Sequence, residues 1–262
     1  MSYLLNRIHR WWLGRILRKA RIPESVWKRA VHDLPIIGLL PEPDRHRLRE
    51  LSSLFMHYKT ISGAGGLEVD DYMCTVIAAQ ACLLILNLGL DYYSGWVEVI
   101  VYPNAFIAPH EELDEAGVLH QSDSHLSGEA WGRGPVILSW EDIRPQRHHS
   151  SQHGINVVLH EFAHKIDLLT GSANGMPPLH QSMTPGKWSE DFSLAYHRML
   201  RHIQGGHGSR IDPYAVESPA EFFAVVTEFF FERPLLLRQE LPSVYEQLVR
   251  FYRQEPHHYP SA

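Results

Sequence analysis

The sequence predicts an α+β fold, with a mostly helical N-terminal part and a small sheet in the C-terminal part. Two observations predict this class: several long segments carry apolar residues at helical spacing, and two short β-branched segments are bounded by turn residues. Apolar residues make up 44% and charged residues 21% of the 262 residues, which is typical of a soluble globular protein. A chain of this length can bury its core in one domain or in two closely packed units.

The individual elements follow from local patterns along the chain. The stretch from Asp70 to Asn87 is nearly all apolar and is therefore expected to form a central helix. A glycine-rich turn, Gly63–Gly66, precedes it, and the long polar connection 104–134 is expected to border a cleft. In chain order, the expected elements are helices at 41–60 and 70–87, strands at 97–102 and 136–139, and helices at about 155–170, 189–204, 218–231 and 242–254.

Basic residues concentrate at the N-terminus. Residues 1–31 hold eight Lys and Arg against one acid, Glu24, so the rest of the chain carries 16 basic and 29 acidic residues, a net charge of −13. Such an acidic body is not suited to follow a nucleic-acid backbone. The apolar stretches near the N-terminus are too short to span a bilayer. Two interpretations stay open, a helix lying on a membrane surface and an ordinary helix packed on the domain. The expected helix interleaves apolar Leu4, Leu5, Ile8, Trp11, Trp12, Leu13, Ile16 and Leu17 with cationic Arg7, Arg10, Arg15, Arg18 and Lys19.

The two cysteines, Cys74 and Cys82, lie in one apolar helical stretch. Core packing in a reducing compartment explains them better than a disulfide, so we expect a cytoplasmic protein.

A possible metal site is carried by the motif His160-Glu161-Phe162-Ala163-His164. On a helix, positions i and i+4 share a face, so the two imidazoles can bind one Zn²⁺, and Glu161 then lies where it can take a proton from a zinc-bound water. That is the chemistry of a zinc metalloprotease. With 18 histidines in the chain, such a motif arises by chance with a probability on the order of a tenth. The apolar residues that precede it favour a buried helix and therefore a real site.

Asp167 lies three residues after His164 and seven after His160, on the same helical face. Zinc-bound histidines commonly donate their other N–H to a carboxylate, and we expect Asp167 to accept such a bond. The alternative is an ordinary Asp near a helix C-terminus, where the helix dipole is slightly unfavourable to it.

An open zinc site usually has three protein ligands, so the two histidines need a third. Glu221 is the favoured candidate, with Glu217 and Glu228 as weaker alternatives. Ser218 is expected to cap a helix that begins at Pro219, and in that pattern Glu221 could instead bond the backbone of Ser218 as an ordinary capping box.

At this point the chain resembles a known family. The histidine motif followed by Tyr214 and Glu221 is similar to the gluzincin arrangement of zinc metallopeptidases, closely to the Mlc titration factor A family and distantly to the anthrax lethal factor catalytic domain. The resemblance implies a zincin-like fold with the sheet over the motif's helix. It also implies zinc bound by His160, His164 and Glu221, with Glu161 as general base and Tyr214 stabilising the oxyanion. The matching segments, from about Pro35 onward, are Leu88–Leu90, Val99–Pro103, Gly128–Trp131, Gly134–Trp140, His160–Asp167, Tyr214–Ala224 and Phe251–Pro256.

The resemblance also points to His120. The segment Gly117-Val118-Leu119-His120 matches a family segment whose histidine is an additional zinc ligand, which would fill the site and leave no position for water. The implied state is latent until the loop moves away. From the sequence alone, His120 is one histidine in a polar loop.

Two functions of different classes follow. One is a zinc peptidase, aminopeptidase-like by resemblance, acting on a peptide or protein; the other is a non-catalytic module that sequesters a regulator such as the repressor Mlc. Glu161 and Tyr214 together favour catalysis, because a pure binder needs neither. The strand at 136–139 is expected to be a sheet edge on which an extended peptide can add as a strand. The expected organisation is a basic amphipathic segment at 1–31, a helical part at 32–95 and a zincin-like catalytic part at 96–262.

Overall fold

A computed structural model describes residues 14–104, 134–144 and 156–256 with their side chains, and the backbone of short strands between residues 106 and 130. The expectation for the extreme N-terminus, residues 1–13, lies outside the described residues. Residues 14–20 are helical, and Ile16 within them is 7% exposed. Among the described residues, no helix is both long and apolar enough to cross a membrane.

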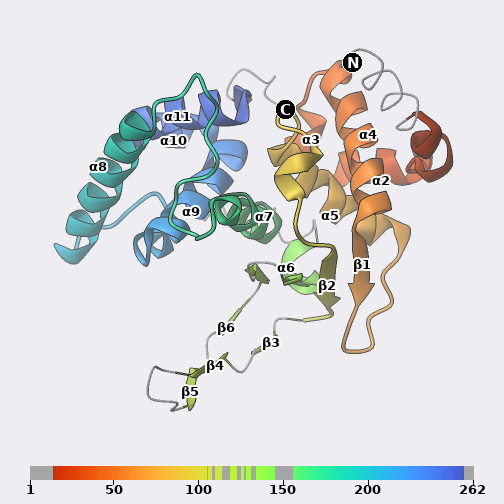
Figure 1. Ribbon diagram of the computed structural model, residues 1–262, viewed down its shortest axis with the longest axis horizontal. Helices are drawn as coiled ribbons and strands as arrows, with labels where there is room; N and C mark the ends of the chain where they lie inside the picture. Colours follow the sequence, from red (N-terminus) through yellow and green to blue (C-terminus); the bar gives the residue numbers. More distant parts are fainter. Residues whose placement is uncertain are drawn as a thin grey trace.

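The structure is mostly helical with one small sheet, as the sequence predicts for an α+β protein. Figure 1 shows α2–α5 on one side of the molecule and α8–α11 on the other, with α7 between them. The helices are α2 (Glu24–Asp33), α3 (Pro35–Gly38), α4 (Glu42–Tyr58), α5 (Asp71–Leu84), α6 (Trp140–Ile143), α7 (Val157–Asp167), α8 (Pro185–Gln204), α9 (Pro219–Glu232), α10 (Pro234–Glu240) and α11 (Pro242–Tyr252), with short 3-10 turns η1 (Leu90–Tyr93), η3 (Leu168–Thr170) and η4 (Pro213–Val216).

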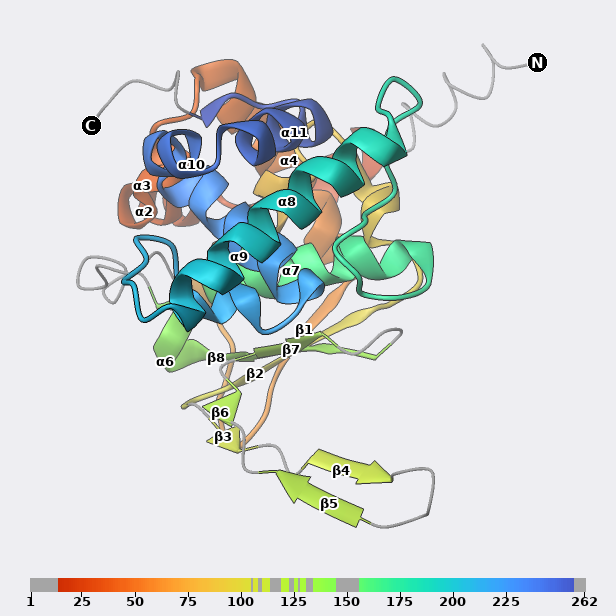
Figure 2. The same cartoon turned by 90° about the vertical axis from the view of Figure 1, so that its left-hand side faces the viewer.

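The sheet lies beneath α7 (Figure 2) and has the strand order β1-β2-β8-β7. The first three of these strands are parallel, and β7 is antiparallel to β8. Helix α5 supplies the crossover that a parallel pair requires between β1 and β2. The strands are β1 (Thr60–Gly63), β2 (Glu98–Tyr102), β7 (Gly128–Ala130) and β8 (Val136–Ser139), with two separate antiparallel pairs, β3 (Phe106–Ile107) with β6 (His125–Leu126) and β4 (His110–Leu113) with β5 (Leu119–Ser122).

Two expectations about the sheet are wrong. Strand β1 occupies residues that were expected to end a helix and begin a turn. Its last residue, Gly63, packs so closely on the chain that a Cβ there would lie 1.9 Å from the carbonyl oxygen of Leu67. The strand at 136–139 is not a sheet edge, because β7 pairs with it on the side away from β2.

Helix α5 is central, as its apolar sequence predicts. The run from Val76 to Leu86 is essentially without solvent exposure, and α5 packs against α2, α4 and α7. Alternate residues of the parallel strands, Val99, Val101, Val136 and Leu138, complete the same core from the sheet side.

Helix α7 is anchored on an aromatic cluster. The ring of Phe162 lies 5.7 Å from Phe55, 5.1 Å from Tyr93 and 5.7 Å from Trp96 by ring centroids. Aromatic pairs of this kind contribute about 0.5–1.5 kcal/mol each beyond the apolar area they bury. Because Phe162 lies between the two histidines of the motif, the cluster fixes the opposite face of α7 and turns the histidines toward α9.

Candidate metal centre

Helices α7 and α9 bring the three predicted ligands together. The Nε2 atom of His160 lies 2.9 Å from Glu221 Oε2 and 3.1 Å from His164 Nε2, and His164 Nε2 lies 3.3 Å from Glu221 Oε1. In a tetrahedral zinc site with bonds of 2.0–2.2 Å, neighbouring ligand atoms are separated by about 3.3 Å. The observed separations are close to this value, so the three side chains fit a metal ion.

The state of Glu221 supports the same conclusion. Its Oε2 atom is buried and accepts no well-aligned hydrogen bond from any residue that the structure describes, although His160 Nε2 lies 2.9 Å away. Burial raises the pKa of Glu221, but the contacts with His160 and His164 outweigh burial and bring it down to about 2. The side chain is therefore a carboxylate at neutral pH, as a metal ligand must be. A buried carboxylate oxygen of this kind, beside two ring nitrogens, fits a bound cation.

The helix caps explain how Glu221 is free to serve as a ligand. The hydroxyl of Ser218 accepts the backbone N–H of Glu221 at 3.1 Å, and Pro219 occupies the first helical position. Only this half of the predicted capping box forms. The carboxylate of Glu221 turns toward the histidines instead.

Glu228 takes the role that the sequence suggested for Asp167. His160 donates its Nδ1–H to Glu228 Oε1 at 2.7 Å, which leaves Nε2 as the nitrogen available to a metal. Burial raises the pKa of Glu228, and its bonds with His160 and with the N–H of Asn156 oppose that rise. Glu228 stands seven residues after Glu221 on the same face of α9, a spacing that indicates its place near the site but not its role.

A buried hydrogen-bond network extends from Glu228 to the centre of the fold. The backbone N–H of Asn156 donates to Glu228 Oε2 at 2.6 Å. The side-chain amide of Asn156 donates to Gln80 on α5 and to Glu232 on α9, each at 2.7 Å, and its oxygen caps α7 at the N–H of Leu159. The position of His160 is thus tied to three helices.

Asp167 is buried, and it binds the loop that contains Gly175 and not a histidine of the motif. Its Oδ2 accepts the N–H of Gly175 at 2.7 Å, and its Oδ1 is buried without a hydrogen bond to the part of the chain that the structure describes. Burial raises the pKa of Asp167, which the Gly175 bond and the charge of His164 oppose. The predicted hydrogen bond to a zinc-bound histidine is not among those of the described residues.

Glu161 and Tyr214 lie at the same site. Glu161 is 5% exposed, and its charge acts on His160 and Tyr214. The ring of Tyr214, carried by η4, lies 6.1 Å from that of His160 by centroids. Burial and the charges of Glu221 and Glu161 raise the pKa of Tyr214 to about 12, so its phenol keeps the proton that it would donate. The hydroxyl of Tyr196 fastens η4 by donating to Val216 O at 3.0 Å.

Lys165 was not singled out in the sequence. It follows the motif directly, is 2% exposed, and donates from Nζ to the carbonyl of Gly134 at 2.9 Å. This bond ties α7 to the residues that lead into β8. Burial lowers the pKa of Lys165 to about 8, against the attraction of Glu161.

His120 belongs to β5, where it is paired with Glu112 of β4. The position of its side chain is not described, and the same holds for the other side chains of residues 105–133.

Comparisons with known proteins identify the family of this chain. The model of the family described as glucose-regulated metallo-peptidase M90 matches residues 8–253. The chain is similar to proteins named Mlc titration factor A from Yersinia pestis (strain Pestoides F) and from Yersinia pseudotuberculosis serotype O:3 (strain YPIII). Each is 34% identical over 248 residues, which covers 94% of this chain and 90% of the relative. These similarities confirm the resemblance that the motifs indicated.

Proposed function

The chain belongs to the glucose-regulated metallo-peptidase M90 family, and from that premise we propose that it is a zinc-dependent, aminopeptidase-like peptidase. The observation that carries the proposal is the meeting of His160, His164 and Glu221 at ligand distances beside Glu161. Two imidazoles and one carboxylate are the ligands of a catalytic zinc that keeps a fourth position for water.

The proposed mechanism gives each side chain a separate task. When bound, zinc would polarise the scissile carbonyl and acidify the attacking water. Glu161 takes the proton of that water and passes it to the departing amine. Tyr214 donates a hydrogen bond to the oxyanion that develops on the carbonyl. Glu228 holds the ring of His160 with Nε2 toward the site.

The test combines metal analysis with a defined digest. We expect the purified protein to hold about one zinc per chain, to shorten peptides with a free N-terminus, and to lose that activity when a chelator removes the metal. The matched substrates are the same peptides with an acetylated N-terminus, which an aminopeptidase leaves intact. Cleavage of both sets within the chain would make it an endopeptidase, and no zinc-dependent cleavage of any peptide would contradict the proposal.

Glu228→Gln is expected to weaken zinc binding about 10- to 100-fold, because the neutral amide accepts the Nδ1–H of His160 less strongly. Competition with a chromophoric chelator measures the dissociation constant. The matched control is Glu232→Gln, one helical turn further along α9, which keeps an oxygen for Asn156 and makes no bond to His160. Equal losses in both variants would show that the effect is on folding and not on His160.

We also propose that His120 completes the metal shell in a latent state, as the resemblance implies. His120→Ala is then expected to keep its zinc through the three other ligands and to turn over peptide faster than wild type, since the position for water is open. Steady-state kinetics with one fluorogenic peptide measures the change. A slower or unchanged His120→Ala variant would remove His120 from the site.

A second candidate function rests on the names of the relatives, Mlc titration factor A, which point to binding of a Mlc-like transcriptional repressor. The two functions separate experimentally. A binder that does not cleave would capture such a repressor equally well with Glu161→Gln and would show no hydrolysis in either form.

We place the protein in the cytoplasm, with peripheral membrane contact through residues 1–21. Both cysteines are free, which fits a reducing compartment. The full chain is expected to pellet with anionic vesicles, less so at high salt, and a chain that begins at Ile22 is expected to stay in the supernatant with its peptidase activity intact. Misfolding of the shortened chain would instead show that the segment is part of the core.

A further inference from the structure

A groove runs along α8, apart from the residues of the metal centre. One hollow of about 500 Å³ lies between α8, the loop 207–211 and the end of α10. A second hollow of about 340 Å³ continues along α8 toward the start of α11. The two form one groove, called here the α8 groove, because they share the lining residues Ala195, Arg198, Arg201, Glu240 and Leu241.

The floor of the α8 groove is apolar. Met199 is 8% exposed and Ile211 3% exposed, and Ala195 and Leu241 line the floor beside them. Such a floor favours an apolar side chain of an occupant over water.

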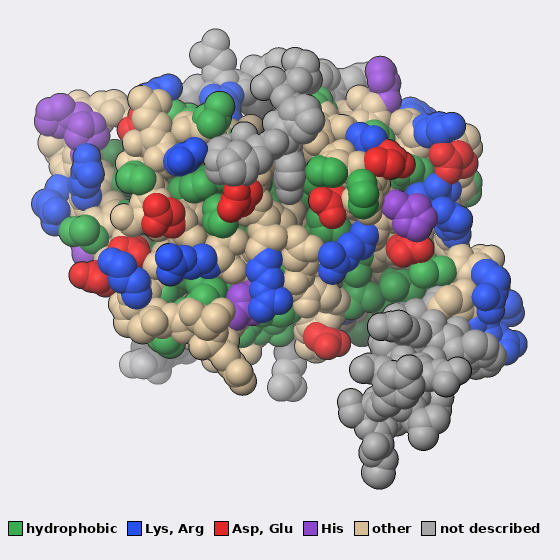
Figure 3. All heavy atoms as spheres, turned by 90° about the horizontal axis from the view of Figure 1, so that it is seen from above, with side chains coloured by type: hydrophobic (Ala, Val, Ile, Leu, Met, Phe, Trp, Pro, Cys, Tyr) green, Lys and Arg blue, Asp and Glu red, His purple; other side chains and the backbone are tan. Residues whose placement is uncertain are grey.

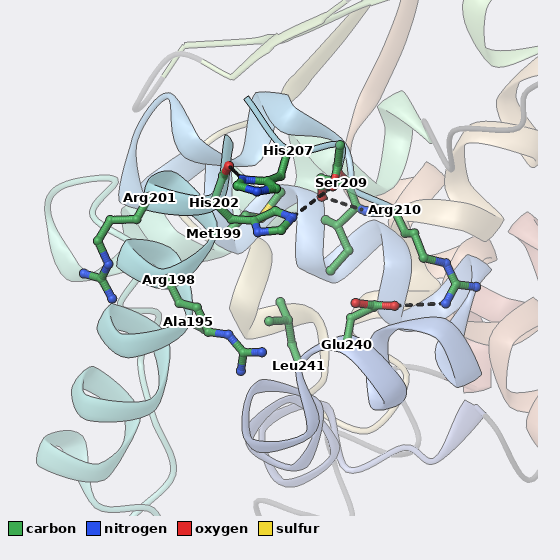
Figure 4. A pocket seen from close by; sticks show the side chains of 12 residues that line it. Ala195, Arg198, Met199, Arg201, His202, His207, Ser209, Arg210, Glu240 and Leu241 are labelled. Carbon is green, nitrogen blue, oxygen red and sulfur yellow. Dashed lines mark hydrogen bonds and ion pairs between the residues drawn. The ribbon is translucent and has the colours of Figure 1, made fainter. Parts of the chain in front are cut away.

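Arginines outnumber acids on the rim of the groove, where Arg198, Arg201 and Arg210 lie near Glu240 and Asp191. Asp191 is already paired with Lys187 at 2.8 Å. Arg210 is paired with Glu240 at 2.9 Å. Arg198 and Arg201 are exposed on α8 and form no ion pair or hydrogen bond through their side chains with any residue that the structure describes. In Figure 4, Arg198 extends across the groove toward Leu241, whereas Arg201 projects from the outer side of α8.

Two histidines near Arg201 are already engaged in contacts within the protein. The rings of His202 and His207 stack with centroids 4.7 Å apart, and their nitrogens bond the carbonyls of Gly208 and His202. These contacts shape the loop that forms one wall of the groove. The arginines therefore remain as the groups available to an occupant.

The positive charge of Arg198 and Arg201 indicates that a partner in the α8 groove is anionic. The chain beyond residue 31 has a net charge of −13. Figure 3 nevertheless shows Lys, Arg and His side chains along the margin on the side of α8, with acidic side chains among them and a second basic group at the opposite margin. A basic groove on an acidic body attracts an anionic partner and repels other basic segments. The chain's own basic N-terminus is excluded as an occupant for the same reason.

The length of the groove favours an extended peptide over a small anion. From Asp191 to His202, α8 rises about 16 Å, which is the length of about five extended residues. Exposed arginines bind single carboxylates weakly, so a tight complex needs several charges together with apolar contact. A peptide segment that carries carboxylates and an apolar side chain can contact the arginines of the rim and the apolar floor at the same time.

We propose that the α8 groove binds an acidic segment of a partner protein, with one carboxylate at Arg198 in the groove, a second at Arg201 where the segment leaves it over the outer side of α8, and an apolar side chain over Met199, Ile211 and Leu241. This site goes beyond the proposed peptidase function, because none of its residues belongs to the metal centre. Binding is measured directly, so the result does not depend on whether the chain hydrolyses peptides.

The probe is a fluorescein-labelled, N-acetylated twelve-residue peptide with leucine at every third position among glutamates. Its match has glutamine in place of each glutamate. Fluorescence anisotropy is expected to show binding of the acidic peptide that weakens with salt, and at least tenfold weaker binding of its match. Mass spectrometry after the titration verifies that the peptide is intact.

Two variants test the rim and the floor separately. Arg198→Glu/Arg201→Glu is expected to weaken binding at least tenfold, because two attractions become repulsions. Ala195→Trp is expected to weaken it to a similar extent by filling the floor while every arginine remains. The matched control is Arg238→Glu/Arg250→Glu, with the same change of charge on exposed positions of α10 and α11 outside both hollows. Its affinity is expected to equal that of wild type.

Equal affinity for the two peptides would overturn the proposal, as would an affinity that neither the rim nor the floor variant lowers. An equal loss in the Arg238→Glu/Arg250→Glu control would show attraction to net charge alone and would also overturn it. If wild type forms a dimer that Arg198→Glu/Arg201→Glu dissociates, the occupant is a second copy of this chain and not an acidic partner.

Discussion

Replacing Glu161 by glutamine is expected to lower kcat for peptide hydrolysis by about a thousandfold or more while zinc content and melting temperature stay at wild-type values. Glutamine has the same shape but cannot take the proton of the attacking water, so only the proton transfer is lost. Glu161 is 5% exposed and is not one of the three clustered side chains that could hold the metal. Kinetics with a fluorogenic peptide and metal analysis on one sample measure both quantities.

Glu217→Gln is the control for this loss. Glu217 ends η4, is exposed, and lies close enough to the site for its charge to act on Tyr214. Its neutralisation removes a nearby carboxylate without touching the proposed base, so turnover is expected to stay within a few-fold of wild type. Hydrolysis by Glu161→Gln at the wild-type rate would leave the regulator-binding function as the better account.

The second large effect is loss of the metal itself. His160→Ala/His164→Ala is expected to contain almost no zinc after gel filtration, because Glu221, even together with the proposed ligand His120, leaves too few ligands to hold the ion at protein concentrations. Metal analysis by mass spectrometry compares it with wild type, for which we expect about one zinc per chain. The basis is the clustering of both Nε2 atoms with Glu221.

A second pair of histidines provides the control. His202 and His207 are also neighbours, with ring centroids 4.7 Å apart, but neither forms an ion pair with a carboxylate among the described residues. His202→Ala/His207→Ala is therefore expected to keep its zinc. Full zinc in the His160→Ala/His164→Ala variant would place the metal elsewhere in the chain.

The sequence predicted the features that depend on short-range spacing. The two histidines one helical turn apart, the cap at Ser218 and the apolar α5 are local patterns, and the structure contains each of them. Glu221 needed one further argument, that a metal with two histidines lacks a ligand, and the structure brings it to them.

What the sequence did not show depends on contacts between distant segments. Strand β1 has only four residues and ends in glycine, and β7 contains no β-branched residue, so neither has a strand signature. The prediction that β8 is an edge strand was wrong because β7, which pairs with it, could not be recognised in the sequence. Lys165 looks like any charged residue after a helix motif, since only the fold brings the carbonyl of Gly134 to it.

Glu228 shows a different limit. It was considered as a ligand but not as the partner of a ligand, because a carboxylate near a metal can play either part and spacing alone does not separate them. The orientation of His160 decides: its Nδ1 faces Glu228 and its Nε2 faces Glu221.

The network from His160 through Glu228 and Asn156 to Gln80 has a thermodynamic consequence. A ligand that binds only the folded state stabilises it by about 2.7 kcal/mol when its free concentration is a hundred times its dissociation constant. Because the last member of the network lies on α5, at the centre of the helices near the N-terminus, that stabilisation is not confined to the helices that hold the metal. Zinc would slow amide hydrogen exchange in α5 as well as in α7 and α9, so that loss of the metal and opening of the core become a single cooperative event.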